Sequence, residues 1–176
     1  MELRAATAHD AEVIAGLHAD SWRRNYRGAF LDSFLDGDVF ADRVTVWRER
    51  LAKPDPAAFT IVADHDGDVV GFSYTKLDDD PRWGALLDNL HVTHARKRGG
   101  IGTRLVAETA RELRARAPES GLYLFVLAQN TAAQAFYAAR GGVEVDRTVR
   151  GPFPGGGTAP SLRIAWPDPS VLLTPD

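Results

Sequence analysis

The chain contains no cysteine, which excludes disulfide bonds, thiolate metal sites and a cysteine nucleophile. No apolar run approaches the roughly 18 residues that a membrane span needs, so we expect no membrane partner. The first ten residues, MELRAATAHD, include acidic side chains and lack an apolar stretch, so we expect no secretory signal. Together these absences favour a cytoplasmic protein.

An excess of positive charge is also lacking, because the formal net charge is −3. This argues against a nucleic-acid-binding protein, and any site for an anion must therefore be local. A metal site is not predicted either. No metal-ligand spacing is found among His9, His18, His65 and His94.

What the chain does contain is ordinary for one globular domain: 176 residues, 44% hydrophobic and 26% charged. We predict a single domain over residues 1–167 and an irregular tail over residues 168–176. No internal repeat or linker divides the chain.

The first half predicts two helices and an antiparallel hairpin. After a strand over Leu3–Thr7, Asp10 is placed to cap a helix that ends before Gly28. A second helix is predicted from about Asp38 to Leu51. The hairpin is indicated by Asp66-Gly67, which separates two β-rich runs, Phe59–Ala63 and Val69–Thr75.

The second half alternates strands and helices before two closing strands. The predicted strands are Leu86–Val92, Gly121–Leu127, Val143–Val149 and Leu162–Trp166, and the predicted helices are Ile101–Ala117 and Asn130–Arg140. The order is β-α-α-β-β-β-α-β-α-β-β. This order predicts an α+β fold with a mixed sheet.

A glycine-rich loop, His94–Thr103, joins a strand directly to an amphipathic helix. A helix N-terminus exposes unpaired N–H groups, and glycines let a phosphate approach the backbone. The loop is not a Walker A motif, because no Gly-Lys-Ser/Thr closes it, and it matches a dinucleotide fingerprint poorly. An anion site and a plain solvated turn both remain open from this loop alone.

A second pattern begins some 28 residues after Gly102, where Asn130 stands at an N-cap position before Ala133, Phe136 and Tyr137. These three share one helix face by their spacing. Phe136 is interpreted as a core residue. For Tyr137, a core role and a functional role remain open.

The two patterns resemble the motifs of GNAT acetyltransferases. Lys97-x-x-Gly100-x-Gly102 resembles their Arg/Gln-x-x-Gly-x-Gly/Ala motif, and Asn130-x-x-Ala133-x-x-Phe136-Tyr137 resembles their second motif. The resemblance covers about Phe59–Trp166 and implies a mixed, mostly antiparallel twisted sheet flanked by helices. The chain departs from the pattern at Lys97, at Arg98-Gly99, and at Leu86, where some members carry a glutamate general base.

The resemblance implies an N-acetyltransferase that binds acetyl-CoA and moves the acetyl group to a primary amine by direct attack in a ternary complex. Backbone N–H groups of Arg98–Thr103 would hold the pyrophosphate, and a strand N–H near His91 or Val92 would stabilise the oxyanion. Tyr137 resembles the general acid, and Asn130 a cofactor contact. The implied cofactor-binding set is Leu90, His91, Val92, Lys97, Arg98, Gly99, Gly100, Ile101, Gly102, Thr103, Asn130, Ala133, Phe136 and Tyr137.

A general base is not given by the resemblance, since Leu86 occupies its usual place. Asp88 is favoured because a residue two positions along a regular strand points to the same face. His91 is the second candidate, because histidine is the residue type whose unperturbed pKa lies near neutrality. A bound water remains a third alternative.

The acceptor is predicted to be a small-molecule or peptide amine. The residues predicted to line its binding site are Trp22, Tyr26, Arg27, Trp83 and Asp88. Arg27 suits an acceptor carboxylate, whereas the aromatic residues alternatively only pack the first helix on the sheet. Asp78–Asp80 is either a solvated loop or a segment that attracts a cationic amine.

The intact Asn130 and Tyr137 favour an enzyme over a non-catalytic acyl-CoA-binding module. Many members dimerise through sheet edges, so a homodimer and a monomer both remain open.

Overall fold

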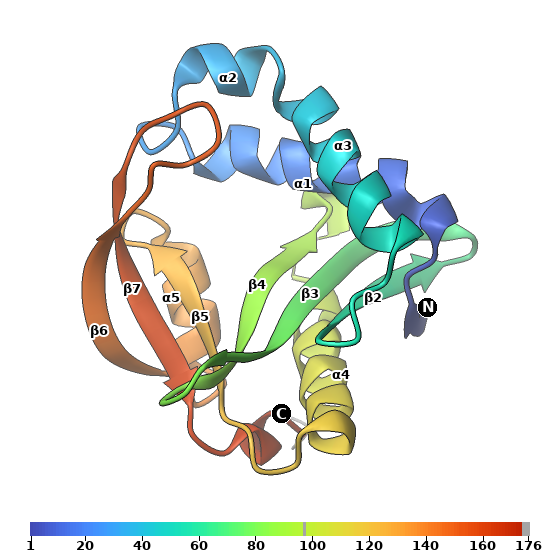
Figure 1. The fold of residues 1–176 in the computed structure, drawn as a ribbon, viewed down its shortest axis with the longest axis vertical. Helices are drawn as coiled ribbons and strands as arrows, with labels where there is room; N and C mark the ends of the chain where they lie inside the picture. The colour runs from blue at the N-terminus through green and yellow to red at the C-terminus, as the bar shows by residue number, and fades with distance from the viewer. Residues whose placement is uncertain (97, 174–176) are drawn as a thin grey trace.

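The computed structural model describes residues 1–96 and 98–173, so the predicted phosphate-site residue Lys97 lies outside the described residues. A seven-stranded sheet runs in the order β1-β2-β3-β4-β5-β7-β6 (Figure 1). Its strands are β1 Glu2–Ala5, β2 Ala58–His65, β3 Asp68–Asp80, β4 Gly84–Val92, β5 Leu122–Leu127, β6 Val143–Arg150 and β7 Ala159–Trp166. All neighbouring strands are antiparallel except β4 and β5. The predicted α+β fold with a mixed, mostly antiparallel sheet is confirmed.

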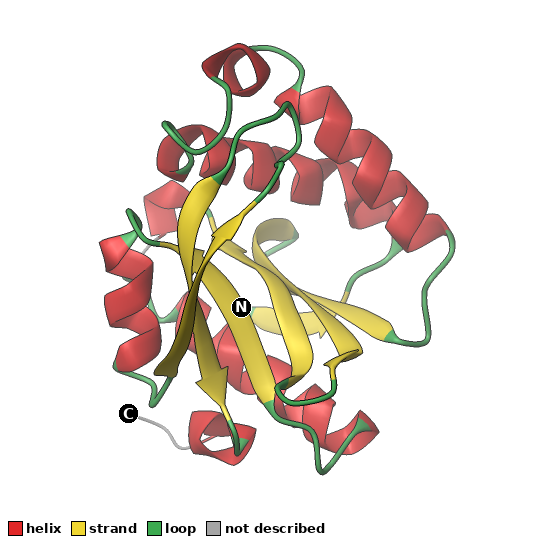
Figure 2. Ribbon diagram, turned by 60° about the vertical axis from the view of Figure 1, so that its left-hand side comes forward, coloured by secondary structure: helices red, strands yellow, loops and turns green. Residues whose placement is uncertain are grey.

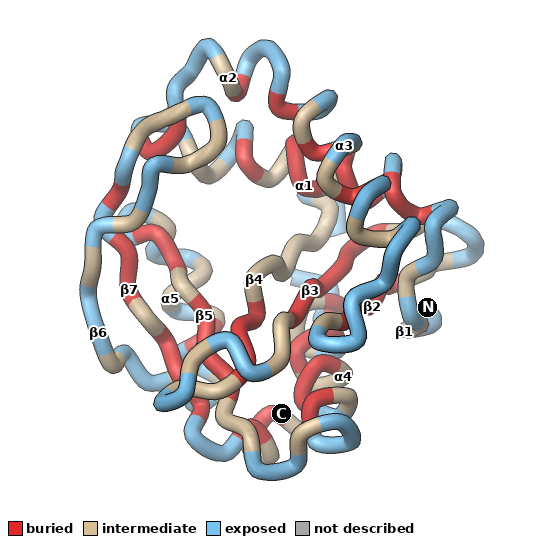
Figure 3. Tube along the Cα trace, viewed as in Figure 1, coloured by how far each residue is buried: buried red, intermediate tan, exposed pale blue. Residues whose placement is uncertain are grey.

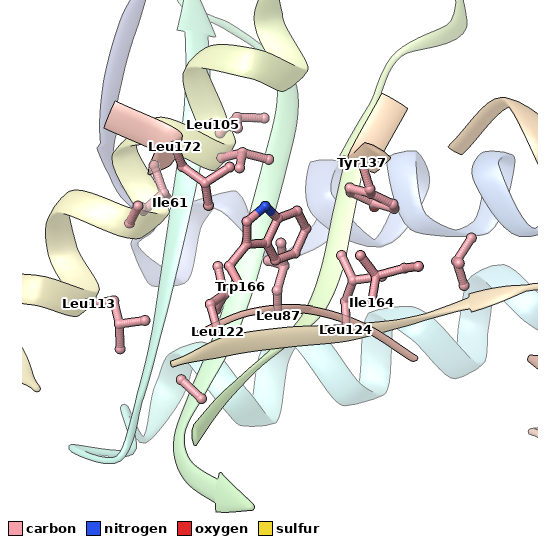
Figure 4. Packing of buried hydrophobic residues seen from close by; sticks show 14 of the residues in the cluster. Ile61, Leu87, Leu105, Leu113, Leu122, Leu124, Tyr137, Ile164, Trp166 and Leu172 are labelled. Atoms are coloured by element: carbon pink, nitrogen blue, oxygen red, sulfur yellow. The ribbon is translucent and has the colours of Figure 1, made fainter. Parts of the chain in front are cut away.

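Helices cover both faces of this sheet (Figures 1 and 2). On one face, α1 (Ala11–Asn25) and α3 (Val39–Ala52) pack on β2 and β3 through a cluster that includes Ile14, Trp47 and Phe72. On the other face lie α4 (Ile101–Arg116) and α5 (Thr131–Ala138). Their core includes Leu105, and Tyr137 lies beside Trp166 in the same cluster (Figure 4).

Helix α1 forms because its apolar residues repeat at helical spacing. Ala11, Ile14, Ala15, His18, Ala19 and Trp22 are all buried. The predicted capping by Asp10 is wrong for this helix, since no side chain caps it. Asp10 instead accepts a hydrogen bond from the Thr7 backbone N–H at 2.7 Å, and it forms an ion pair with Arg4 at 2.9 Å.

Strand β4 has a bulge at Asp88. Tyr74 of β3 pairs with Asn89, and the next residue, Thr75, pairs with Leu87. Asp88 is therefore an extra residue, and the side-chain alternation changes phase there. Leu87 and Leu90, three residues apart, consequently pack in the same core under α4.

Beyond this bulge β4 and β5 separate. The two strands are paired only at Ala85↔Leu122 and Leu86↔Tyr123. The gap opens toward the N-terminal helices, as Figure 1 shows between the two strands. Backbone groups of β4 that face β5 past Leu86 therefore have no strand partner on that side.

Three elements differ from the sequence prediction. The helix α2 (Asp32–Asp36) was not predicted, and Asp78–Asp80, expected in a loop, belong to β3. The tail was expected to be irregular, but Pro169–Leu173 form a 3₁₀-helix. Leu172 of that helix is buried in the main core, where Figure 3 shows buried chain near the C-terminus.

Candidate active site

A cavity of about 680 Å³ occupies the gap between β4 and β5. Its size is typical of small-molecule sites. The walls come from both strands, the first turn of α4, α5 and the end of α1. Most of the predicted site residues line it: Tyr26, Asp88, Leu90, His91, Val92, Arg98, Gly100, Ile101, Gly102, Thr103, Asn130, Ala133, Phe136 and Tyr137.

One end of the cavity is the N-terminus of α4. Gly100 is the N-cap residue with a φ of 74°, a left-handed conformation, and no side chain caps the helix. A Cβ atom on Gly100 would meet nothing within 4 Å, whereas one on Gly102 would lie 3.2 Å from the Phe136 ring. The first glycine thus leaves the helix N–H groups open to the cavity, and the second lets α4 and α5 approach.

Cations gather at this end. Arg96 and Arg98 line the cavity, and Arg140 of α5 joins them. The Arg140 guanidinium lies 3.8 Å from the centre of the Phe136 ring and donates a hydrogen bond to Thr103 Oγ1 at 3.1 Å. The helix N-terminus and these guanidinium groups together suit a phosphate or pyrophosphate. The sequence patterns had no signal for Arg140, which α5 brings to α4.

Asn130, the N-cap residue of α5, and Tyr137 both line the cavity. Asn130 caps α5 as predicted, because its Oδ1 accepts a hydrogen bond from the Ala133 N–H at 3.2 Å. Tyr137 is 8% exposed, and its hydroxyl makes no hydrogen bond with the residues that the structure describes. Burial raises the pKa of this phenol above its usual value of about 10, so it stays protonated at neutral pH.

Asp88 lies on the α1–α3 side of the sheet, where its carboxylate is 3.7 Å from Arg50 of α3. Asp88 is the bulged residue of β4, and it lines the cavity. Next to it, the pKa of the Tyr26 phenol is raised to about 12 by burial and then by the Asp88 charge. Asp88 and Tyr26 thus share one end of the cavity.

His91 lines the cavity and packs against His18, which the sequence analysis considered only as a metal ligand. The His91 ring lies 4.9 Å from that of His18, which is 1% exposed. His18 Nδ1 accepts a hydrogen bond from Trp47 Nε1 at 3.1 Å. His18 also approaches the bulged part of β4, because its Nε2 lies 3.5 Å from the side-chain amide nitrogen of Asn89.

Three residues predicted around an acceptor lie elsewhere. Trp22 is a core residue, 7% exposed under the Arg43 guanidinium. Arg27 forms ion pairs with Asp32 and Asp36 of α2. Trp83 and the predicted cofactor residue Gly99 do not line the cavity either. Trp22 of α1 therefore acts in packing, whereas Tyr26, the residue that follows α1, lines the cavity together with Asp88.

No group of metal-binding side chains is found within residues 1–96 and 98–173. None of the helices in the same ranges is long and apolar enough to cross a membrane.

Comparison with known proteins defines the class. Residues 19–142 match the acetyltransferase (GNAT) family, and the chain therefore belongs to that family and is an N-acetyltransferase. It is 26% identical over 175 residues to an uncharacterized N-acetyltransferase, YuaI, of Bacillus subtilis (strain 168), covering 98% of this chain and 96% of the relative.

Two solved structures share the fold. The PaiA N-acetyltransferase of Thermoplasma acidophilum, in complex with coenzyme A, has a TM-score of 0.74 at 17% identity and covers 94% of this chain and 98% of its own. YncA of Salmonella typhimurium, a putative acetyltransferase with its cofactor acetyl-CoA, has a TM-score of 0.67 at 15% identity, with coverages of 94% and 92%.

Proposed function

We propose that this protein transfers an acetyl group from acetyl-CoA to a primary amine by direct attack in a ternary complex. The observation that carries the proposal is the cavity between β4 and β5, which runs from the uncapped N-terminus of α4 to Tyr137 and Asp88. A thioester donor fits one end and an amine the other. The acceptor is a small molecule or a peptide.

The residues present fit coenzyme A. N–H groups of the first turn of α4, with Arg96 and Arg98, hold the pyrophosphate. The unpaired edge of β4 offers backbone hydrogen bonds to the amide-containing arm, and an N–H near His91 or Val92 serves as the oxyanion donor. When bound, acetyl-CoA supplies an activated acetyl group.

Tyr137 is the proposed general acid. Its hydroxyl keeps its proton at neutral pH and donates it to the departing sulfur, whose ordinary pKa is about 8.5. Burial keeps the hydroxyl protonated until the thiolate forms. The phenolate left after the transfer takes up a proton again before the next turnover.

The acceptor amine has to lose a proton, because an alkylamine with a pKa of about 10.4 is neutral in only about one molecule in two thousand at pH 7. Asp88 is the proposed base, acting directly or through a water, and His91 is the alternative. Arg50 holds Asp88 from the side of α3, at 3.7 Å. The homodimer and the cytoplasmic location stay predictions from the sequence.

The test is release of free thiol from acetyl-CoA across a panel of amines, followed by Tyr137→Phe. We expect amine-dependent thiol release, and in the variant a fall in kcat of about 100-fold or more, because acid catalysis typically contributes that much. Coenzyme A affinity, measured by calorimetry, should change little.

Tyr123→Phe is the matched control, because Tyr123 is equally buried but bonds Asp79 outside the cavity. It should retain nearly normal turnover. A Tyr137→Phe enzyme as fast as the wild type would remove this residue from the mechanism. An enzyme that releases no thiol with any amine would contradict the proposed reaction.

A further inference from the structure

Arg150 is a cation held against the wall of the cavity. It is the last residue of β6 and pairs with Ala159 of β7. The centre of its guanidinium lies 4.1 Å from the centre of the Phe125 ring, which is cation–π contact, and Phe125 lines the cavity. The aromatic ring therefore holds the guanidinium beside a residue that lines the cavity, although Arg150 itself is not among the lining residues.

Within residues 1–96 and 98–173, no carboxylate pairs with this guanidinium. In the part of the chain that the structure describes, Arg150 has no hydrogen bond or ion pair, and its side chain is half-buried. Other arginines on these strands are paired: Arg147 with Glu144, and Arg163 with Asp80 at 3.3 Å. A partly buried cation without a partner is costly, so its retention next to a cavity points to an anionic ligand.

The charges around Tyr26 show which end of the cavity is concerned. Asp88 raises the pKa of the Tyr26 phenol and Arg150 lowers it, so this ring feels a carboxylate and a guanidinium together. The phosphate-binding cations, Arg96 and Arg98, belong to the loop before α4. Arg150 therefore serves the acceptor end, where Asp88 is placed to receive an amine.

We propose that Arg150 binds a carboxylate of the acceptor, so that the preferred acceptors are amino acids and related amines that carry a carboxylate. The inference rests on the proposed acetyl transfer and names its substrate class. The planar guanidinium of Arg150 suits bidentate recognition of a carboxylate. The carboxylate docks on Arg150 over Phe125, and the amine points toward Asp88.

The experiment uses the purified full chain and pairs of amines that differ only in a carboxylate: phenethylamine with phenylalanine, and cadaverine with lysine. The wild type should show a kcat/KM about 10-fold or more higher for the carboxylate member. In Arg150→Gln the KM for that member should rise about 10- to 100-fold, the range of a charged hydrogen bond. The KM for the member without a carboxylate and the affinity for coenzyme A should stay within about 2-fold.

Two further variants make the result specific. Arg150→Lys keeps the charge but not the planar fork, so its KM should lie between those of the wild type and Arg150→Gln. Arg147→Gln changes an exposed, already paired arginine of the same strand and should leave the preference unchanged. Thermal unfolding of each variant verifies that it is folded.

Equal effects of Arg150→Gln on both members of a pair would overturn the inference, as would a loss of coenzyme A affinity. Efficient acetylation of amines without regard to the carboxylate would also overturn it while leaving the proposed function intact. Absence of thiol release with every amine would instead contradict the proposed function, and this inference with it.

Discussion

His18 should make the folded protein sensitive to mild acid. Its ring is buried between α1 and α3, where it accepts a hydrogen bond from Trp47. Burial, then the neighbouring His91, and then Arg43 and Arg50 hold the pKa of His18 well below its usual 6.5. The folded protein therefore keeps this imidazole neutral at a pH at which an exposed histidine is charged.

The size of the effect follows from the protons bound in each state. Below about pH 6.5 the unfolded chain takes up a proton on His18 and the folded protein does not. The unfolded state then binds more protons, so the free energy of unfolding falls as the pH falls. A histidine that takes up no proton in the folded state over this range lowers the free energy of unfolding by up to about 2 kcal/mol from pH 7 to pH 5, or about 4–8 °C in Tm for a chain of this length.

Urea unfolding at pH 7, 6 and 5 measures this loss in the wild type and in His18→Gln. The amide oxygen of glutamine still accepts a hydrogen bond from Trp47, but glutamine does not titrate. The variant should be less stable at pH 7, and its deficit should shrink by about 2 kcal/mol at pH 5. A deficit that stays constant over this range would show that His18 does not resist protonation in the folded state.

Two further predictions concern packing and the cofactor. Leu172→Ala should lower the free energy of unfolding by about 2–5 kcal/mol in urea, because the side chain is buried in the main core. Val171→Ala, 50% exposed beside it, should change it by less than about 0.5 kcal/mol, and equal losses would contradict the packing described. Gly100→Glu should abolish acetyl-CoA binding in calorimetry, since it places a carboxylate at the uncapped helix N-terminus. A variant that bound as tightly as the wild type would exclude this site for the pyrophosphate.

The sequence predicted most of the fold because its local signals agree with the tertiary structure. The Asp66-Gly67 turn, the amphipathic stripe of α4 and the Asn130 cap are all found. The bulge at Asp88 was not predictable, because it is defined by pairing with β3 rather than by the residues of β4. Likewise α2 is five residues long, too short to show a helical period.

The site residues that belong to sequence motifs were predicted, and those that packing brings to the site were missed. Gly100 and Tyr137 were found from spacing, and both line the cavity. His18, Arg140 and Arg150 carry no local pattern, since each becomes interesting only through a neighbour from a distant segment. The opposite error occurred at Trp22, which was predicted to contact the acceptor but is part of the core.

The separation of β4 and β5 has a mechanical consequence. With only two paired positions between them, the sheet consists of a four-stranded part and a three-stranded part joined at one end. A ligand with its own amide groups, inserted in the gap, would act as the missing strand and bridge the two parts. Occupancy would then change the stiffness of the whole protein, and amides along β4 and β5 should exchange with solvent more slowly when the gap is filled.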